Sequence, residues 1–250
     1  MKNQALKKMF FLLLLAVSQF FISCKKDEVN QTTYSCITCK NTPDAKAEFD
    51  NSNKGIYKGV MVGSSGVIVF NLLNTGTAIS ASLTIDTKST TLTSSTALVA
   101  GQSFSGSFSG VLNGQNVSLN FTVSATGTNP IISLINIPGH QNAIFQLFKE
   151  TSDNQIIGFE GNTEGVKDSG AKQSGQLNIL ASLKTNSWIA LSTSSTSSNV
   201  NIVSGKISGT TYSCDCGPTT TVVGTLTGDQ INGTYKGSDN KGTWVAKRTF

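Results

Sequence analysis

Apolar and polar residues alternate strictly along several segments of this chain. Between residues 116 and 125, Val117, Leu119, Phe121 and Val123 interleave with asparagine, serine and threonine. A period of two predicts a strand that turns one face to a core and the other to water. Turn-forming residue pairs follow such segments at short intervals, which favours antiparallel strands joined by tight turns. Three more segments alternate in the same way: 67–73, 79–85 and 177–183.

Glycines add a second pattern, because many recur four residues apart, as at Gly106 and Gly110. Four is an even number, so both members of a pair face the same side of a strand. The residue midway between them, on that same face, is almost always large and apolar. Alternating small and large residues are typical of the inner face of a tightly curved sheet. We therefore expect these large residues to be core: Tyr57, Met61, Phe108, Leu112, Ile207, Leu226 and Tyr235.

These patterns predict an all-β fold for residues 54–250, either an antiparallel β-barrel or a β-sandwich. A glycine-bounded segment followed by Ser-Gly and an apolar run occurs at 55–70 and again at 158–179. This internal repeat suggests two duplicated β-sheet halves, 54–150 and 151–250, although β-rich sequences also produce such repeats by chance. A single barrel built from both halves is the alternative.

Composition supports the β interpretation. Charged residues make up only 13% of the chain, too few for a coiled coil or a long helical bundle. Hydrophobic residues make up 38%, enough to exclude ordinary disorder. The formal net charge of +5 comes almost wholly from lysine, since Arg248 is the only arginine. Without arginine forks or a clustered basic stripe, we expect no nucleic-acid partner.

The N-terminus has the layout of a secretory signal peptide over residues 1–23. Three lysines, at positions 2, 7 and 8, precede an unbroken apolar run over 9–17, and a small residue, Ser23, precedes Cys24. The run is too short to cross a bilayer comfortably. Removal of this leader takes away three lysines, which lowers the formal charge from +5 to +2.

The end of the leader, Phe21-Ile22-Ser23-Cys24, resembles the bacterial lipobox, and the following Lys25-Lys26-Asp27-Glu28 resembles the export signal of Bacteroidota surface lipoproteins. Phe21 stands where leucine is usual. The resemblance covers about thirty residues and is specific to location only. It implies that Cys24 is lipidated, that acyl chains such as palmitate anchor the protein in the outer membrane, and that the protein faces the cell exterior. The polar stretch 24–53 is then a flexible tether. A plain secreted protein with an incidental Cys24 is the alternative.

Four further cysteines form two close groups, Cys36 with Cys39 and Cys214 with Cys216. An exported protein meets an oxidising compartment, so disulfides are expected, with three pairings open. A bridge between cysteines only two positions apart closes a strained ring, which favours bridges between the two groups. A zinc site made from all four thiols is the alternative, although structural zinc usually uses cysteine pairs with at least two residues between the thiols.

Catalytic motifs are absent from the sequence. No serine has the Gly-x-Ser-x-Gly spacing, and neither the dinucleotide-binding fingerprint nor the P-loop occurs, so we expect no cofactor. The only histidine, His140, follows an apparent Pro-Gly turn and is expected to be a loop residue. A hydrolase alternative rests on five carboxylates that lie close together in the sequence: Glu150, Asp153, Glu160, Glu164 and Asp168. Such a cluster is more typical of a solvated hairpin.

Both tryptophans, Trp188 and Trp244, lie in strand-like sequence. On an exposed face they would offer stacking platforms for sugars, and on an inner face they would be core, which is the commoner case. Our leading hypothesis is a non-enzymatic surface lipoprotein that binds a ligand, such as a glycan, or helps an outer-membrane protein assembly. A structural or adhesive spacer is the alternative from another class.

Overall fold

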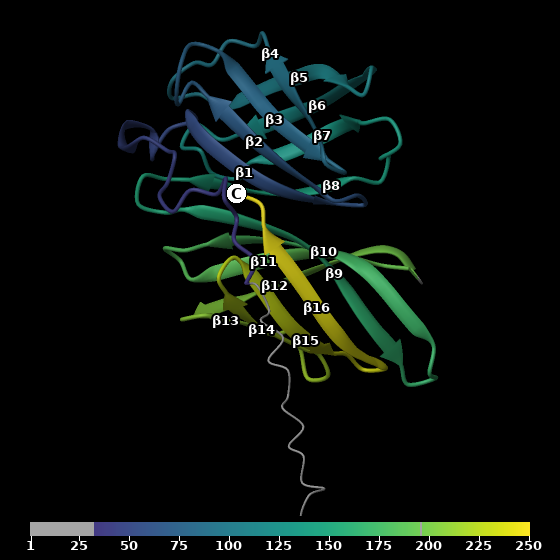
Figure 1. Ribbon diagram of the computed structural model, residues 1–250. Helices are drawn as coiled ribbons and strands as arrows, with labels where there is room; N and C mark the ends of the chain where they lie inside the picture. The colour runs from purple at the N-terminus through teal and green to yellow at the C-terminus, as the bar shows by residue number, and fades with distance from the viewer. Residues whose placement is uncertain (1–32, 196) are drawn as a thin grey trace, which may run out of the picture. The chain divides into compact units, whose positions relative to one another are not determined.

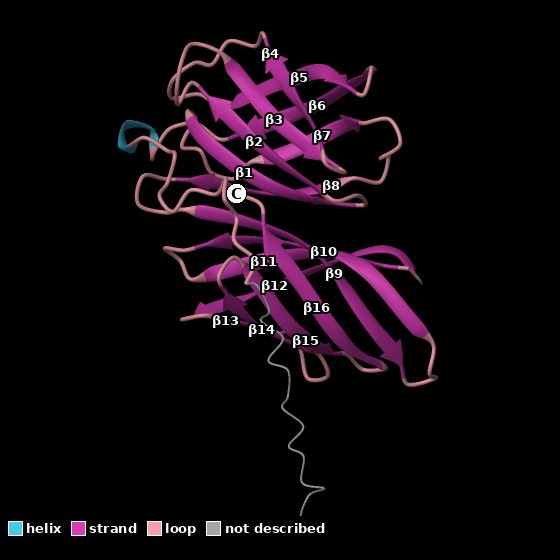
Figure 2. Cartoon of the chain, viewed as in Figure 1, coloured by secondary structure: helices cyan, strands magenta, loops and turns pink. Residues whose placement is uncertain are grey.

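The computed structural model describes residues 33–195 and 197–250 (Figure 1). Within these ranges the chain forms sixteen antiparallel strands, which confirms the all-β prediction (Figure 2). The one helix in these ranges, η1 (Ala47–Phe49), is a single 3-10 turn, and no described helix is long and apolar enough to span a membrane. The strands are β1 (Gly55–Val62), β2 (Gly66–Leu72), β3 (Ile79–Ile85), β4 (Lys88–Ser94), β5 (Phe104–Leu112), β6 (Gln115–Val123), β7 (Ile131–Asn136), β8 (Ile144–Glu150), β9 (Ile156–Lys167), β10 (Lys172–Ser182), β11 (Ser187–Ser194), β12 (Ser197–Ser208), β13 (Thr211–Asp215), β14 (Thr221–Thr227), β15 (Gln230–Lys236) and β16 (Asn240–Arg248).

The strands divide into two sheets of eight, and neighbouring strands in each sheet are mostly consecutive along the chain. The first sheet runs β7-β6-β5-β4-β3-β2-β1-β8, so it is an up-and-down meander whose last strand returns beside the first. The second sheet, β9 to β16, follows the same path and closes into a barrel, because β16 also pairs with β9. The first sheet is open only between β7 and β8. The change from one sheet to the other falls between Glu150 and Ile156, beside the predicted boundary at 150/151.

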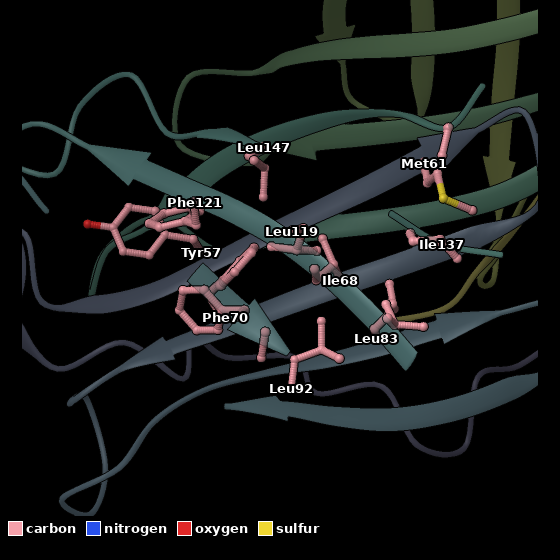
Figure 3. Close-up of a cluster of buried hydrophobic side chains, with 14 of the residues drawn as sticks. Tyr57, Met61, Ile68, Phe70, Leu83, Leu92, Leu119, Phe121, Ile137 and Leu147 are labelled. Carbon is pink, nitrogen blue, oxygen red and sulfur yellow. The ribbon is translucent and has the colours of Figure 1, made fainter. Parts of the chain in front are cut away.

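Aliphatic side chains and a group of aromatic rings fill the interior of the first sheet (Figure 3). The Phe121 ring centroid lies 4.3 Å from that of Phe70 and 5.2 Å from that of Tyr57, and Phe70 meets Phe108 edge-on at 5.0 Å. Such offset and edge-to-face pairs add to the free energy of burying the rings. Tyr57, Met61 and Phe108 are fully buried, as the glycine pattern predicts.

Strand β1 is buried along its whole length because it has a core on each face. Tyr57 and Met61 point into the first sheet. Val60 and Val62, on the other face, pack in a separate cluster with Ile156, Leu180 and Leu191 of the second sheet. Lys58 lies on that same face, 4% exposed, with its Nζ 2.7 Å from Glu150 Oε2.

The prediction of a flexible tether over residues 24–53 is wrong for the described residues 33–53, which are docked on the folded body. The Tyr34 hydroxyl donates to the Arg248 carbonyl (3.0 Å), and the Cys36 N–H donates to Asp229 Oδ2 (2.8 Å). Arg248 also donates to Asn41 Oδ1 (3.2 Å) and to the Lys40 carbonyl. Because Asp229 lies between β14 and β15, this segment, residues 33–41, covers the end of the barrel where that turn lies. We call it the strap.

The disulfides form inside each cysteine group, so the expected bridges between the groups are wrong. Cys36 bonds Cys39 and Cys214 bonds Cys216, with Cα atoms 5.3 and 5.5 Å apart, inside the usual range for a disulfide. The groups cannot meet, because Cys36 contacts the β14–β15 turn whereas Cys216 follows β13, at the other end of β14. The same separation excludes a zinc site built from all four thiols.

Candidate functional site

A cavity of about 690 Å³ opens at the end of the β9–β16 barrel that lies opposite the strap. Its rim comes from strand ends at Lys167 and Ser194 and from the turns after β13 and β15, which contribute Thr220 and Asp239. An eight-stranded barrel is wide enough to hold one small ligand. Ligand sites in proteins occupy roughly 300–1,000 Å³, so this cavity has the size of a binding site.

Trp188 on β11 and Trp244 on β16 form the floor of the cavity. They are only 3% and 4% exposed. Each indole N–H donates to a backbone carbonyl at 3.2 Å, that of Lys206 for Trp188 and that of Thr234 for Trp244. With the polar atom satisfied, each ring presents hydrocarbon to its surroundings. Both tryptophans therefore belong to the barrel interior, and the structure contradicts an exposed stacking platform at either position.

Glycines on neighbouring strands make the room for these rings. A Cβ on Gly205 would lie 2.7 Å from the indole of Trp188. Cβ atoms on Gly224 and Gly233 would lie 2.4 and 2.2 Å from the indole of Trp244, closer than real carbon contacts allow. The spacing of glycines seen in the sequence thus corresponds to the close approach of strands to large rings on the inner face.

The cavity changes from apolar at its floor to polar at its rim. Above the tryptophans, the wall consists of apolar side chains: Leu177, Ile179, Ala190, Val203 and Val222. Nearer the opening, Tyr235 accepts a hydrogen bond from Gln173 Nε2 at 3.4 Å. Several further rim residues carry hydroxyl or amide groups: Ser192, Thr193, Asn199, Asn201, Thr220 and Asn240. This lining suits a ligand with an apolar surface and several hydroxyl groups.

No charged side chain lines the cavity near its floor. Burial raises the pKa of Tyr212, which packs in the same cluster, to about 12, although the charge of Arg248 acts in the opposite direction. Tyr212 is therefore neutral at physiological pH. The charged residues of the cavity, Lys167 and Asp239, both belong to its rim. An uncharged group is expected to enter most deeply, because an unpaired ion at an apolar floor is unfavourable.

The cysteines are distributed over both ends of the barrel. Cys214 packs against the interior cluster and Cys216 lines the cavity, so one disulfide stands at the rim. Cys36 and Cys39 belong to the strap at the other end. In residues 33–195 and 197–250, no three His, Cys, Asp or Glu side chains are grouped to hold a metal ion. Cys24 lies outside the described residues.

His140 belongs to the loop between β7 and β8, as predicted. Its Nδ1 shares a hydrogen bond with the Ser64 hydroxyl of the β1–β2 turn. Its Nε2 lies 4.0 Å from Oδ2 of Asp86, which is beyond hydrogen-bonding distance. Asp86 does not therefore hold the imidazole in place as the acid of a catalytic triad does.

The carboxylates behind the hydrolase alternative point to different places. Glu150 is fully buried and accepts hydrogen bonds from Lys58 Nζ and from the Ile156 N–H at 3.0 Å. Asp153 pairs with Lys184 at the surface. Glu160 accepts a hydrogen bond from the Ser65 hydroxyl at 2.8 Å, and burial raises its pKa against the effect of that bond. None of these three lines the cavity, so they supply no pair of carboxylates to it.

Sequence reasoning found the floor of this site through its tryptophans and glycines, but it missed the polar rim. Gln173, Asn201 and Asn240 do not stand out in a chain rich in asparagine and serine, and they line one cavity only because the barrel closes. No family model, curated protein or solved structure matches this chain.

Proposed function

We propose that this protein is a cell-surface lipoprotein, anchored in the outer membrane through Cys24, that binds a ligand without transforming it. The cavity of the second barrel carries the proposal, because a volume of about 690 Å³, an apolar floor and a polar rim are the attributes of a binding site. The scattered carboxylates and the missing catalytic motifs favour binding over hydrolysis. The signal-like leader and the lipobox resemblance support the location.

A glycan is the ligand class that best suits the lining. Sugars combine patches of C–H surface with hydroxyl groups that both donate and accept hydrogen bonds. The wall at Val203 and Val222 fits the first, and the side chains of Gln173, Asn201 and Asn240 fit the second. The cavity, at about 690 Å³, has room for one to a few sugar rings.

The packed interior of the first sheet favours a spacer role for this half of the chain. Its interior is filled by packed apolar side chains, such as Phe70 and Phe121, whereas the interior of the second barrel holds the cavity. The buried face of β1 joins the two sheets, because Val60 and Val62 pack against residues of the second sheet. In this proposal the first sheet holds the binding barrel and offers a surface to an outer-membrane protein partner.

A glycan array probed with the full chain carrying Cys24→Ala tests the binding function. We expect binding to at least one glycan, abolished by Val203→Phe with Val222→Phe, since both side chains point into the cavity. Ser204→Phe with Val223→Phe is the matched control, because these neighbours face outward on the same two strands. A flat result on a broad array, or equal binding by both double variants, would contradict the proposal.

Metabolic labelling with palmitate tests the anchor. Wild-type protein should take up the label and sediment with outer membranes, whereas Cys24→Ala should do neither. Equal labelling of both proteins would show that Cys24 is not the lipidated residue.

A further inference from the structure

Three lysines form a row on the outer face of the second barrel, at the open end. Lys236 of β15 pairs directly with Lys241 of β16, which pairs with Val166 of β9, which pairs with Lys172 of β10. Residues paired across strands point to the same face of a sheet. All three lysines are exposed, and the row spans about 14 Å, three strand spacings.

Like charges placed directly opposite each other destabilise a sheet, as Lys236 and Lys241 do here. None of the three lysines takes part in an ion pair within the described ranges. The acidic residues nearby are Glu164, one row further along β9, and Asp168 and Asp239 in the adjoining turns. An anionic ligand group would relieve the repulsion in the lysine row.

The face is also hollowed at this point. A shallow hollow of about 670 Å³ lies around Val166, with Lys172 and Lys241 on either side of it. Glu164, Ser174 and Thr243 also line it. Two cations beside one carboxylate and two hydroxyls fit a sugar acid: the lysines pair with its carboxylate, and Glu164 accepts from its hydroxyl groups. A uniformly anionic lipid surface fits less well, because Glu164 would repel it.

This hollow and the barrel cavity adjoin each other at the rim. Gln173 and Ser174 line both, and Ser174 is tied to Ser195 by two hydrogen bonds, with distances of 2.7 Å (Ser195 N to Ser174 O) and 3.1 Å (Ser174 N to Ser195 Oγ). A chain of sugars can therefore pass from the cavity over the rim at Ser174 into the outer hollow. One ligand can occupy both.

We propose that the ligand is an acidic oligosaccharide, held with an uncharged end in the cavity and a carboxylate-bearing sugar between Lys172 and Lys241. This inference rests on the proposed function and gives the substrate class of the same site.

The test uses the full chain carrying Cys24→Ala and a panel of oligogalacturonate, oligoalginate and hyaluronan fragments, each with its carboxyl-reduced counterpart. Calorimetry at low salt should show binding to at least one acidic member and at least tenfold weaker binding to its reduced form. Lys172→Glu with Lys241→Glu should weaken binding about tenfold, since two exposed ion pairs are lost and repulsion is added. Lys88→Glu with Lys206→Glu, which makes the same change of charge elsewhere, should bind as wild type.

The outcomes separate this inference from the proposed function. If the cavity double variant abolishes binding while the lysine variant or the reduced glycan binds normally, the cavity function stands and the acidic ligand is wrong. If only neutral glycans bind, the cavity function likewise stands and the acidic ligand is wrong. If no glycan binds, both fail. Lysine-dependent binding to phosphatidylglycerol vesicles, with no binding to acidic glycans, would identify a membrane-facing surface and overturn the inference.

Discussion

The indole of Trp244 occupies the space that a side chain on Gly233 would fill, since a Cβ there would lie 2.2 Å from the ring. It would also approach the Val223 carbonyl to 2.4 Å, which leaves no room for the strand to shift. Gly233→Val should therefore lower the free energy of unfolding by about 2 kcal/mol, the usual penalty for overpacking a core. Urea denaturation measures the change.

The adjacent position on the outer face of β15 provides the control for this prediction. Thr234→Val adds no bulk to the interior, and its backbone carbonyl still accepts from Trp244, so we expect a change within about 0.5 kcal/mol. Equal losses from both variants would show that the glycine does not serve to accommodate the ring.

Lys58 and Glu150 form a buried ion pair at the junction of the two sheets, with the two side chains 5% and 0% exposed. Asp44 Oδ2 lies 3.4 Å from the same ammonium group. Lys58→Met should lower the free energy of unfolding by about 3 kcal/mol, because it leaves a carboxylate buried without its cation. Lys88→Met, at an exposed strand end, should change it little. A small effect of Lys58→Met would mean that water reaches Glu150.

Glu160 should make stability depend on pH. Burial raises its pKa above the ordinary value of 4.5, the Ser65 hydrogen bond opposes that effect, and the charge of Asp86 adds to it. The folded protein therefore keeps the proton to a higher pH than the unfolded chain, so the free energy of unfolding falls as pH rises from about 4.5 through the raised pKa. Glu160→Gln, which still accepts from Ser65, should be more stable than wild type at pH 7 and equal to it at pH 4.

Urea denaturation at both pH values checks this prediction, and Glu164→Gln, four residues along β9 on the exposed surface, is the control. A Glu160→Gln variant that loses stability at pH 7 would show that the carboxylate contributes favourably in the folded state.

Arg248 should hold the strap in place. Its guanidinium donates to Asp229 Oδ1 and Asn41 Oδ1, both at 3.2 Å, and to the Lys40 carbonyl. Arg248→Ala removes these bonds and leaves Asp229 without its cation, which should cost about 2 kcal/mol of stability. Hydrogen exchange should become faster across residues 34–41 in this variant and stay unchanged in Lys206→Ala. Unchanged protection of the strap would show that Tyr34 and Cys36 suffice to dock it.

Alternation along the chain is enough to predict which face of a strand is buried. Val117, Leu119, Phe121 and Val123 are all buried in β6, and their neighbours are more exposed. The glycine spacing likewise predicts the inner face around Tyr57 and Phe108. Both signals are local, because a side chain's face depends only on its parity within the strand.

Features that depend on distant parts of the chain are not predictable in this way. Lys58 reads as a solvent-facing residue until the second sheet covers β1. The strap looks like a tether because its bonds reach Asp229 and Arg248, about two hundred residues away. The predicted disulfide pairing is wrong because the barrel places Cys36 and Cys216 at opposite ends, which ring strain within each cysteine group does not reveal. The cavity itself depends on closure of β16 onto β9, which no local pattern encodes.

The intrinsic fluorescence of the protein tests the central claim most directly, because its two tryptophans, Trp188 and Trp244, both lie at the cavity floor. Titration of the full chain carrying Cys24→Ala with the glycan that binds most strongly on the array should give a saturable change in emission. The change should disappear with Val203→Phe and Val222→Phe and persist with Ser204→Phe and Val223→Phe. Binding that calorimetry detects but that leaves the emission of both tryptophans unchanged would contradict a ligand site in the barrel.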